Sequence, residues 1–210
     1  MRAPQDEGEF VAGLGNRNML TLYFAPGASS FAPHIALHEI GVPFEAKPMS
    51  FKQNDMRKPD YLALNPEGKV PTLVVDGRPL TEVAAILFYI AKRYPETGLL
   101  PPDDIEAEAQ ALSWMSFIAS TLHPARQRGL DYAKQVYGIA DRRLGNGWAI
   151  GRYSIADIHL FRLYWRLANS LHPEPGTFPN LTAHYARMMA RPAVQRTIAA
   201  ENAVGYELPA

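Results

Sequence analysis

Two neighbouring serines, Ser29 and Ser30, stand where a strand pattern gives way to a helix pattern. The segment LYFAPGASSFAPHIALHE breaks at Pro26-Gly27, and apolar residues then return at helical spacing from Phe31. The first turn of a helix has unpaired N–H groups and a partial positive charge, so it stabilises an anion placed there. Two hydroxyl groups at this point could donate to such an anion, although a serine there more often only caps the helix.

Two later segments carry groups that are suited to holding a ligand. In NPEGKVPTLVVDG, Pro71 opens a strand, and a cis Val70–Pro71 bond would leave the main chain of Val70 free to pair with an extended peptide. Only about 5–6% of X–Pro bonds are cis, so the sequence leaves this open. In LTEVAAI, Glu82 precedes an apolar helix, where an acid usually interacts with the helix dipole. Glu82 could instead pair with an ammonium group while the N–H groups of Val83 and Ala84 face a carboxylate.

Alternating strand and helix patterns must position these residues in the first half of the chain, in the order β-α-β-α-β-β-α. The strands are expected at residues 20–24 and 43–49 and on both sides of the Asp76-Gly77 turn. The helices are expected at 31–41, where Gly41 suits a C-cap, before Pro66, and at 82–94. The proline-rich segment 95–104 then predicts a linker. Residues 1–18 are polar and glycine-rich, and we expect a disordered extension there.

Beyond the linker the patterns predict helices only, so residues 105–210 form an all-α domain, after a first domain at 19–94. The expected helices are EAEAQALSWMSFIASTLHPA, LDYAKQVYGIADRRLG, SIADIHLFRLYWRLANSL, FPNLTAHYARMMAR and PAVQRTIAAE. Ser154 and Asp157 have the S-x-x-D form of a helix start, which is a folding signal. The aromatic run HLFRLYWRL is at helical spacing, which favours core packing over a ligand site.

Composition excludes several kinds of protein. The chain has 210 residues, 21 Lys and Arg against 21 Asp and Glu, and no cysteine. The absence of cysteine excludes disulfides, Cys-ligated zinc and a catalytic cysteine, and it is typical of a cytoplasmic protein. We expect no metal, no nucleic acid partner, since there is no basic stripe, and no membrane partner, since no apolar run approaches about 20 residues.

The order and spacing of six segments resemble the cytosolic glutathione transferases, most closely the bacterial beta class. The segments are PGASSFAPH, NPEGKVPTL, LTEVAAI, WMSFIASTLHP, GRYSIAD and YARMMARPAVQR, and the resemblance runs from residue 19 to about residue 208. It implies an α/β thioredoxin-like N-terminal domain and an all-α C-terminal domain. It also implies an enzyme that activates glutathione, its co-substrate, as a thiolate for attack on a small hydrophobic electrophile. The same fold also serves as a non-catalytic glutathione-binding or protein-interaction module, so this interpretation stays open.

The resemblance also implies roles for single residues. Those resembling catalytic positions are Ser29, Ser30 and His123, and those resembling glutathione-binding positions are Lys52, Lys69, Val70, Pro71, Glu82 and Val83. Val70, held by a cis Pro71, would pair with the cysteinyl part of glutathione. Glu82 and the N–H group of Val83 would hold the γ-glutamyl end. A homodimer is implied as well, and the apolar face of the expected helix at 106–122 favours it.

Further roles depend on how closely the chain follows the pattern of the class. Lys69 would lie beside one arm of glutathione, and Lys52 lies one residue away from a lysine that meets the glycine carboxylate. His123 matches a second-domain histidine that faces the sulfur. The class has Ala-Cys-Ser where this chain has Ala28-Ser29-Ser30, which excludes a mixed disulfide and makes Ser29 the expected main donor to the sulfur, with Ser30 the second.

The chain also departs from the class in its second domain. The lysine that often follows the histidine is Pro124 here, and the segment 123–151 is shorter than usual. Both departures fall on the wall of the expected electrophile pocket.

Overall fold

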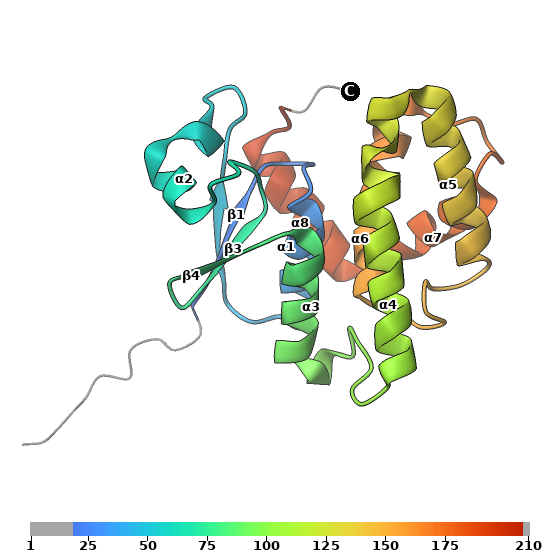
Figure 1. Ribbon diagram of the computed structural model, residues 1–210, viewed down its shortest axis with the longest axis horizontal. Helices are drawn as coiled ribbons and strands as arrows, with labels where there is room; N and C mark the ends of the chain where they lie inside the picture. The colour runs from blue at the N-terminus through green and yellow to red at the C-terminus, as the bar shows by residue number, and fades with distance from the viewer. Residues whose placement is uncertain (1–18, 208–210) are drawn as a thin grey trace, which may run out of the picture.

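The structure is a computed structural model that describes residues 19–207. It has a part built around a β-sheet and a part built from helices, which lie side by side (Figure 1). The expected disordered extension at residues 1–18 lies outside the described residues.

The sheet of the first part has the strand order β2-β1-β3-β4. The strands are β1 (Leu20–Phe24), β2 (Glu45–Pro48), β3 (Thr72–Val75) and β4 (Arg78–Thr81). β1 pairs with β2 in parallel and with β3 antiparallel, while β3 and β4 form the expected hairpin through Asp76 and Gly77. β1 is central and apolar, whereas β2 contains Pro48 and lies at an edge, where a missing N–H donor is tolerated.

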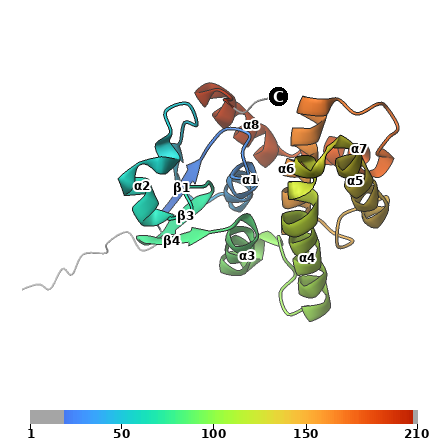
Figure 2. The same cartoon turned by 45° about the horizontal axis from the view of Figure 1, so that its top comes forward.

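Three α-helices cover the sheet, in the predicted order. They are α1 (Phe31–Ile40), α2 (Pro59–Leu64) and α3 (Val83–Arg93), with a 3-10 turn, η1 (Asp55–Arg57), before α2. α1 and α3 lie on the side of the sheet that faces the helical part, and α2 lies on the other side (Figures 1 and 2). α1 ends at Gly41, whose φ of 71° gives the left-handed C-cap that the sequence predicts.

The helical part consists of α4 (Ile105–Phe117), α5 (Leu130–Leu144), α6 (Ile155–Leu171), α7 (Pro179–Met189) and α8 (Pro192–Val204). The predicted linker at 95–104 contains a 3-10 turn, η2 (Pro95–Thr97), and buries Leu99 and Leu100. The domain boundary there stays a prediction.

The helix expected through Leu122 is α-helical only as far as Phe117. It continues as a π-helical turn, η3 (Ile118–Leu122), and a 3-10 helix, η4 (His123–Arg128). Pro124 has no N–H group, so it cannot take part in the regular hydrogen bonding of an α-helix, but it is tolerated in the first turn of η4. His123 therefore begins a new helical turn, where the sequence predicted a helix end.

α8 returns from the helical part to pack along α1 (Figure 1). His38 Nδ1 lies 2.8 Å from Thr197 Oγ1, and Arg191 Nε donates to Glu39 Oε1 over 2.6 Å. One buried apolar cluster runs through both parts, and Phe31 lies 4.7 Å from Trp165 between ring centroids. The two parts therefore share a core, and this core fixes their position relative to each other.

Over residues 19–207, no helix is both long and apolar enough to cross a membrane.

Candidate active site

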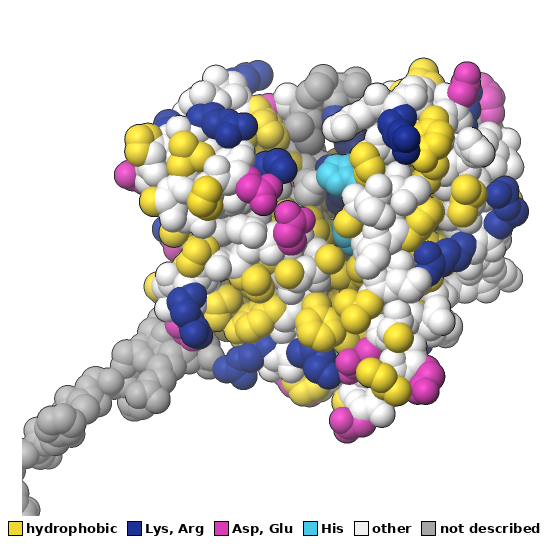
Figure 3. All heavy atoms as spheres, viewed as in Figure 1, with side chains coloured by type: hydrophobic (Ala, Val, Ile, Leu, Met, Phe, Trp, Pro, Cys, Tyr) yellow, Lys and Arg dark blue, Asp and Glu magenta, His cyan; other side chains and the backbone are white. Residues whose placement is uncertain are grey.

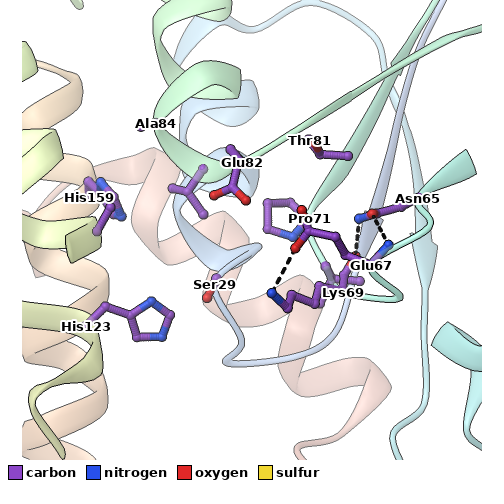
Figure 4. A pocket seen from close by; sticks show the side chains of 13 residues that line it. Ser29, Asn65, Glu67, Lys69, Pro71, Thr81, Glu82, Ala84, His123 and His159 are labelled. Atoms are coloured by element: carbon purple, nitrogen blue, oxygen red, sulfur yellow. Dashed lines mark hydrogen bonds and ion pairs between the residues drawn. The ribbon is translucent and has the colours of Figure 1, made fainter.

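A cavity of about 190 Å³ opens between the two parts. Ser29, the segment 65–71 and the segment 81–84 contribute to one side, which we call the first-domain wall. Ala119, His123 and His159 form the opposite side, the second-domain wall (Figure 4). Histidine side chains face the hollow between the two parts, across from acidic and basic side chains of the first part (Figure 3).

Ser29 lies in the cavity because residues of the helical part hold its loop. The N–H group of Gly27 donates to Glu201 Oε2 over 2.7 Å, and Arg162 Nε donates to the carbonyl oxygen of Ala28 over 3.1 Å. Glu201 is fully buried and also lies 2.9 Å from His34 Nδ1. The Ser29 hydroxyl makes no hydrogen bond within residues 19–207, so it is free to donate to a ligand.

Ser30 does not reach the cavity, contrary to the expectation of a second donor there. Its side chain is fully buried, and its Oγ atom both accepts from the N–H group and donates to the carbonyl oxygen of Ala25, each over 3.1 Å. These bonds close the turn between β1 and α1. In this arrangement Ser30 shapes the loop, and of the two serines only Ser29 lines the cavity.

The segment 65–71 presents main-chain groups to the cavity. Asn65 fixes it, because its Nδ2 atom donates to the carbonyl oxygen of Lys69 over 2.8 Å and its Oδ1 atom accepts from the N–H group of Glu67 over 3.1 Å. The Val70–Pro71 bond is cis, as the motif allowed. The segment also requires a glycine, since Gly68 has a φ of +62° and a Cβ atom there would lie 2.7 Å from the carbonyl oxygen of Met56.

Glu82 has an unusual main-chain conformation, with a φ of 70° and a ψ of 123°, immediately before α3. A non-glycine residue in such a region costs about 1–3 kcal/mol and persists only where the surroundings impose it, often at functional sites. Its exposed carboxylate faces the cavity (Figure 4), next to the unpaired N–H groups at the start of α3. Lys69, with its Nζ atom 2.8 Å from Glu67 Oε2, also lines this wall.

The second-domain wall depends on how α6 begins. Asp157 accepts hydrogen bonds from the N–H groups of Ser154 (2.9 Å) and Ala149 (2.8 Å), and its Oδ1 atom lies 3.1 Å from His184 Nε2. These contacts fix the first turn of α6, and His159 follows on it. The side chain of His159 is 3% exposed, and its Nδ1 atom is buried without a hydrogen-bond partner among the described residues.

Both cavity histidines are neutral at neutral pH. Burial, followed by the positive charges of Arg162 and His123, lowers the pKa of His159 to about 3. Loss of hydration, followed by the charge of Arg162, lowers the pKa of His123 to about 4. The smaller shift at His123 agrees with its greater exposure to the open cavity.

The structure brings together most of the predicted residues, but not all. Ser29, Lys69, Val70, Pro71, Glu82, Val83 and His123 line the cavity. Lys52 does not, and its main-chain N–H group donates to Glu207 Oε2 over 3.0 Å. Across the described part of the chain, no cluster of His, Asp or Glu side chains is arranged to hold a metal ion.

The sequence did not indicate the remaining lining residues, namely Asn65, Glu67, Thr81, Ala119 and His159. Asn65 stands in the motif NPEGKVPTL and could have been noticed there. His159 belongs to the aromatic run that was assigned to core packing, and nothing in its spacing shows that it faces a cavity.

Comparison with known proteins identifies the same two-part organisation. The family model for the glutathione S-transferase N-terminal domain matches residues 18–92, and the model for the C-terminal domain of that family matches residues 85–192. The chain is 32% identical to glutathione S-transferase GstA of Escherichia coli O157:H7, with 87% of this chain and 98% of that relative covered.

Solved structures are similar over the same extent. A sphingomonad glutathione S-transferase complexed with glutathione is 33% identical, with a TM-score of 0.77 and coverage of 87% of this chain and 98% of the other. The bacterial beta class glutathione S-transferase of Sphingomonas chungbukensis is 36% identical, with a TM-score of 0.73 and coverage of 86% and 98%.

Proposed function

The chain belongs to the glutathione S-transferase family, and we propose that its cavity binds glutathione and activates the thiol for attack on a small electrophile. The observation that carries this proposal is the free hydroxyl of Ser29, held at the mouth of α1 and facing His123 across the cavity (Figure 4). Relatives with the same domains are named glutathione S-transferases, and one of the similar structures contains glutathione. No such support exists for the alternative of a non-catalytic binding module.

Glutathione would lie along the first-domain wall. The main chain of Val70 would pair with the cysteinyl part, which directs its thiol toward Ser29. The carboxylate of Glu82 would hold the γ-glutamyl ammonium group, and the N–H groups at the start of α3 would hold the γ-glutamyl carboxylate. Lys69 lies on the same wall and would meet a carboxylate of the peptide.

Ser29 and α1 together can stabilise the thiolate. A free thiol has a pKa of about 8.5, and lowering it by two units requires about 2.7 kcal/mol. The start of a helix supplies about 0.3–1 kcal/mol, or up to about 2 when partly buried, and a hydrogen bond to a charged group supplies about 1.5–3. One hydroxyl at a helix start is therefore sufficient. The rest of the rate acceleration comes from holding the electrophile near the sulfur.

His123 would act from the opposite wall as a neutral imidazole. With a pKa of about 4 it carries no charge at neutral pH. It can accept a hydrogen bond from the thiol before ionisation or donate one to the thiolate afterwards. His123 would therefore affect the rate of the chemical step and not the affinity for glutathione.

Titration of the bound thiol tests this proposal. The absorbance of the thiolate gives the pKa of bound glutathione, and Ser29→Ala should raise that pKa and lower turnover with a generic aryl halide. Ser30→Ala is the matched control: it should lower thermal stability, because Ala25 loses its partner, and leave the thiol pKa near that of the wild type. A wild-type protein that is not retained on glutathione resin, or a Ser29→Ala variant with an unaltered thiol pKa, would contradict the proposal.

We also propose that the protein is a cytoplasmic homodimer. Exposed apolar side chains support this, among them Ile105 and Leu112 on α4 and Phe51 on the loop after β2. Sedimentation at micromolar concentration should give about twice the chain mass of 23.3 kDa. A mass equal to one chain would exclude the dimer.

A further inference from the structure

His159 lies in the cavity with no established task. It comes from α6, is 3% exposed, and lines the second-domain wall beside His123 (Figure 4). A buried imidazole atom without a partner costs free energy, so such an atom calls for an explanation. The neighbouring His123 and Ser29 suffice for the sulfur, which leaves His159 available for the other reactant.

The ring of His159 can meet a ligand through one edge only. Its Nδ1 atom is out of contact with solvent and has no partner among residues 19–207, so the edge available to a ligand is that of Nε2. A neutral imidazole carries its hydrogen on one of the two nitrogens. We assign the hydrogen to Nε2, because an N–H group at Nδ1 would be buried without an acceptor. His159 therefore presents an N–H donor to the cavity.

The charge nearby favours a negative ligand atom at this place. Arg162 lies three residues further along α6, is buried, and is held against the Ser29 loop by its bond to the carbonyl oxygen of Ala28. After burial, its positive charge is the next cause of the lowered pKa of both cavity histidines. An oxygen atom that gains negative charge during a reaction would be stabilised here by a fixed donor in a poorly hydrated site.

We propose that His159 donates a hydrogen bond from Nε2–H to an oxygen atom of the electrophile, so that the enzyme prefers α,β-unsaturated carbonyl compounds over alkyl halides. This inference rests on the proposed glutathione transferase function. In the first class negative charge develops on oxygen during attack, whereas in the second it develops on a departing halide.

The chemical step with an unsaturated carbonyl compound is balanced. The thiolate of glutathione forms a bond to the β-carbon, and the C=C π pair becomes a new π bond between the α-carbon and the carbonyl carbon. The C=O π bond breaks at the same time, and its electron pair moves to the oxygen. His159 Nε2–H donates to the resulting enolate oxygen without giving up its proton. The proton lost by the thiol is balanced by one that water delivers to the α-carbon, which regenerates the carbonyl group in the thioether product.

The test compares two electrophiles in the same enzyme. Measured with glutathione saturating, kcat/KM for an aliphatic 2-enal is divided by kcat/KM for a benzyl halide of similar size. His159→Leu, which removes the donor at similar volume, should lower this ratio at least tenfold, and KM for glutathione should change less than twofold. His172→Asn, at the other end of α6, is the matched control and should keep the ratio of the wild type.

Two polar variants separate donation from mere packing. The amide nitrogen of His159→Gln can occupy the place of Nε2 and should keep much of the ratio. The shorter side chain of His159→Asn cannot reach that place, so this variant should show the same lowered ratio of kcat/KM values as His159→Leu. If His159→Leu fails to fold, the comparison of the Gln and Asn variants still tests the proposal.

Several results would overturn the inference. An unchanged ratio in His159→Leu would do so, as would equal ratios in the Gln and Asn variants. A wild-type enzyme that uses the benzyl halide but not the enal also contradicts it while leaving the transferase function intact. A wild type that uses neither compound and does not bind glutathione contradicts both proposals.

Discussion

The two walls of the cavity are built in different ways. The first-domain wall combines loop segments with polar side chains such as those of Ser29 and Glu82, and short local contacts of Asn65 fix its segment 65–71. The second-domain wall presents an alanine and two histidine side chains from η3, η4 and α6. The first-domain wall carries the charged groups that a peptide with charged ends requires, so we expect it to set the affinity for glutathione. The second-domain wall lies across the cavity from Ser29, so we expect it to set the choice of electrophile.

The two walls are coupled through the loop that carries Ser29. This loop belongs to the first part, but Glu201 from α8 and Arg162 from α6 hold its main chain. A change in the helical part can therefore move the hydroxyl that faces the sulfur. The predictions below test the coupling first and then each wall separately.

The largest effect is expected for Glu201→Ala, which removes the anchor between the walls. The variant leaves the N–H group of Gly27 and the ring of His34 buried without their partner. Removing one member of such a buried set costs about 3–5 kcal/mol of unfolding free energy. Urea denaturation measures the loss, and Asn202→Ala, exposed on the same turn, should stay within about 0.5 kcal/mol of the wild type. Similar stability of both variants would show that the anchor is unimportant.

A smaller effect is expected for Glu82→Ala, which changes the first-domain wall alone. Loss of one partner of a hydrogen-bonded charge pair costs about 2–5 kcal/mol when the pair is buried and less when water reaches it. Because Glu82 is exposed, we expect the lower part of this range, and glutathione affinity, measured by calorimetry, should fall at least tenfold. Glu82→Gln keeps the shape of the side chain and removes its charge, so its glutathione affinity should lie between that of the wild type and that of Glu82→Ala. An affinity equal to that of the wild type in Glu82→Ala would remove Glu82 from the binding site.

His123→Asn changes the second-domain wall and should affect turnover instead of affinity. We expect kcat to fall at least tenfold with a substrate that the wild type uses, while the dissociation constant of glutathione stays nearly the same. Steady-state kinetics and calorimetry on the same preparation separate the two quantities. Full turnover in this variant would leave Ser29 as the group that stabilises the sulfur.

A further effect of the second-domain wall is expected in the pH dependence of stability. The pKa of His159 is about 3 in the folded protein, against about 6.5 in an unfolded chain. Below pH 6.5 the unfolded state therefore binds more protons, and stability falls as the pH falls toward 3. This histidine contributes up to about 1.4 kcal/mol per pH unit. Unfolding of the wild type and of His159→Leu between pH 6 and pH 4.5 should give a shallower slope for the variant, and equal slopes would show that His159 is hydrated.

Residues fixed by nearby parts of the chain could be predicted from the sequence. The strand and helix order, the Asp76-Gly77 hairpin and the Gly41 cap agree with the structure, because backbone sterics and apolar periodicity act over a few residues. The resemblance to a family placed Val70, Glu82 and His123 correctly on the cavity, since each stands beside a local motif.

Tertiary structure alone decided which of the two serines faces the cavity and that His159 lines it. Ser29 and Ser30 are neighbours of the same type, yet one faces the cavity and the other is closed into the turn, on a loop held by residues more than 130 positions away. His159 has the spacing of a core residue, yet it lines the cavity. Such choices depend on packing between distant segments, which local periodicity does not record.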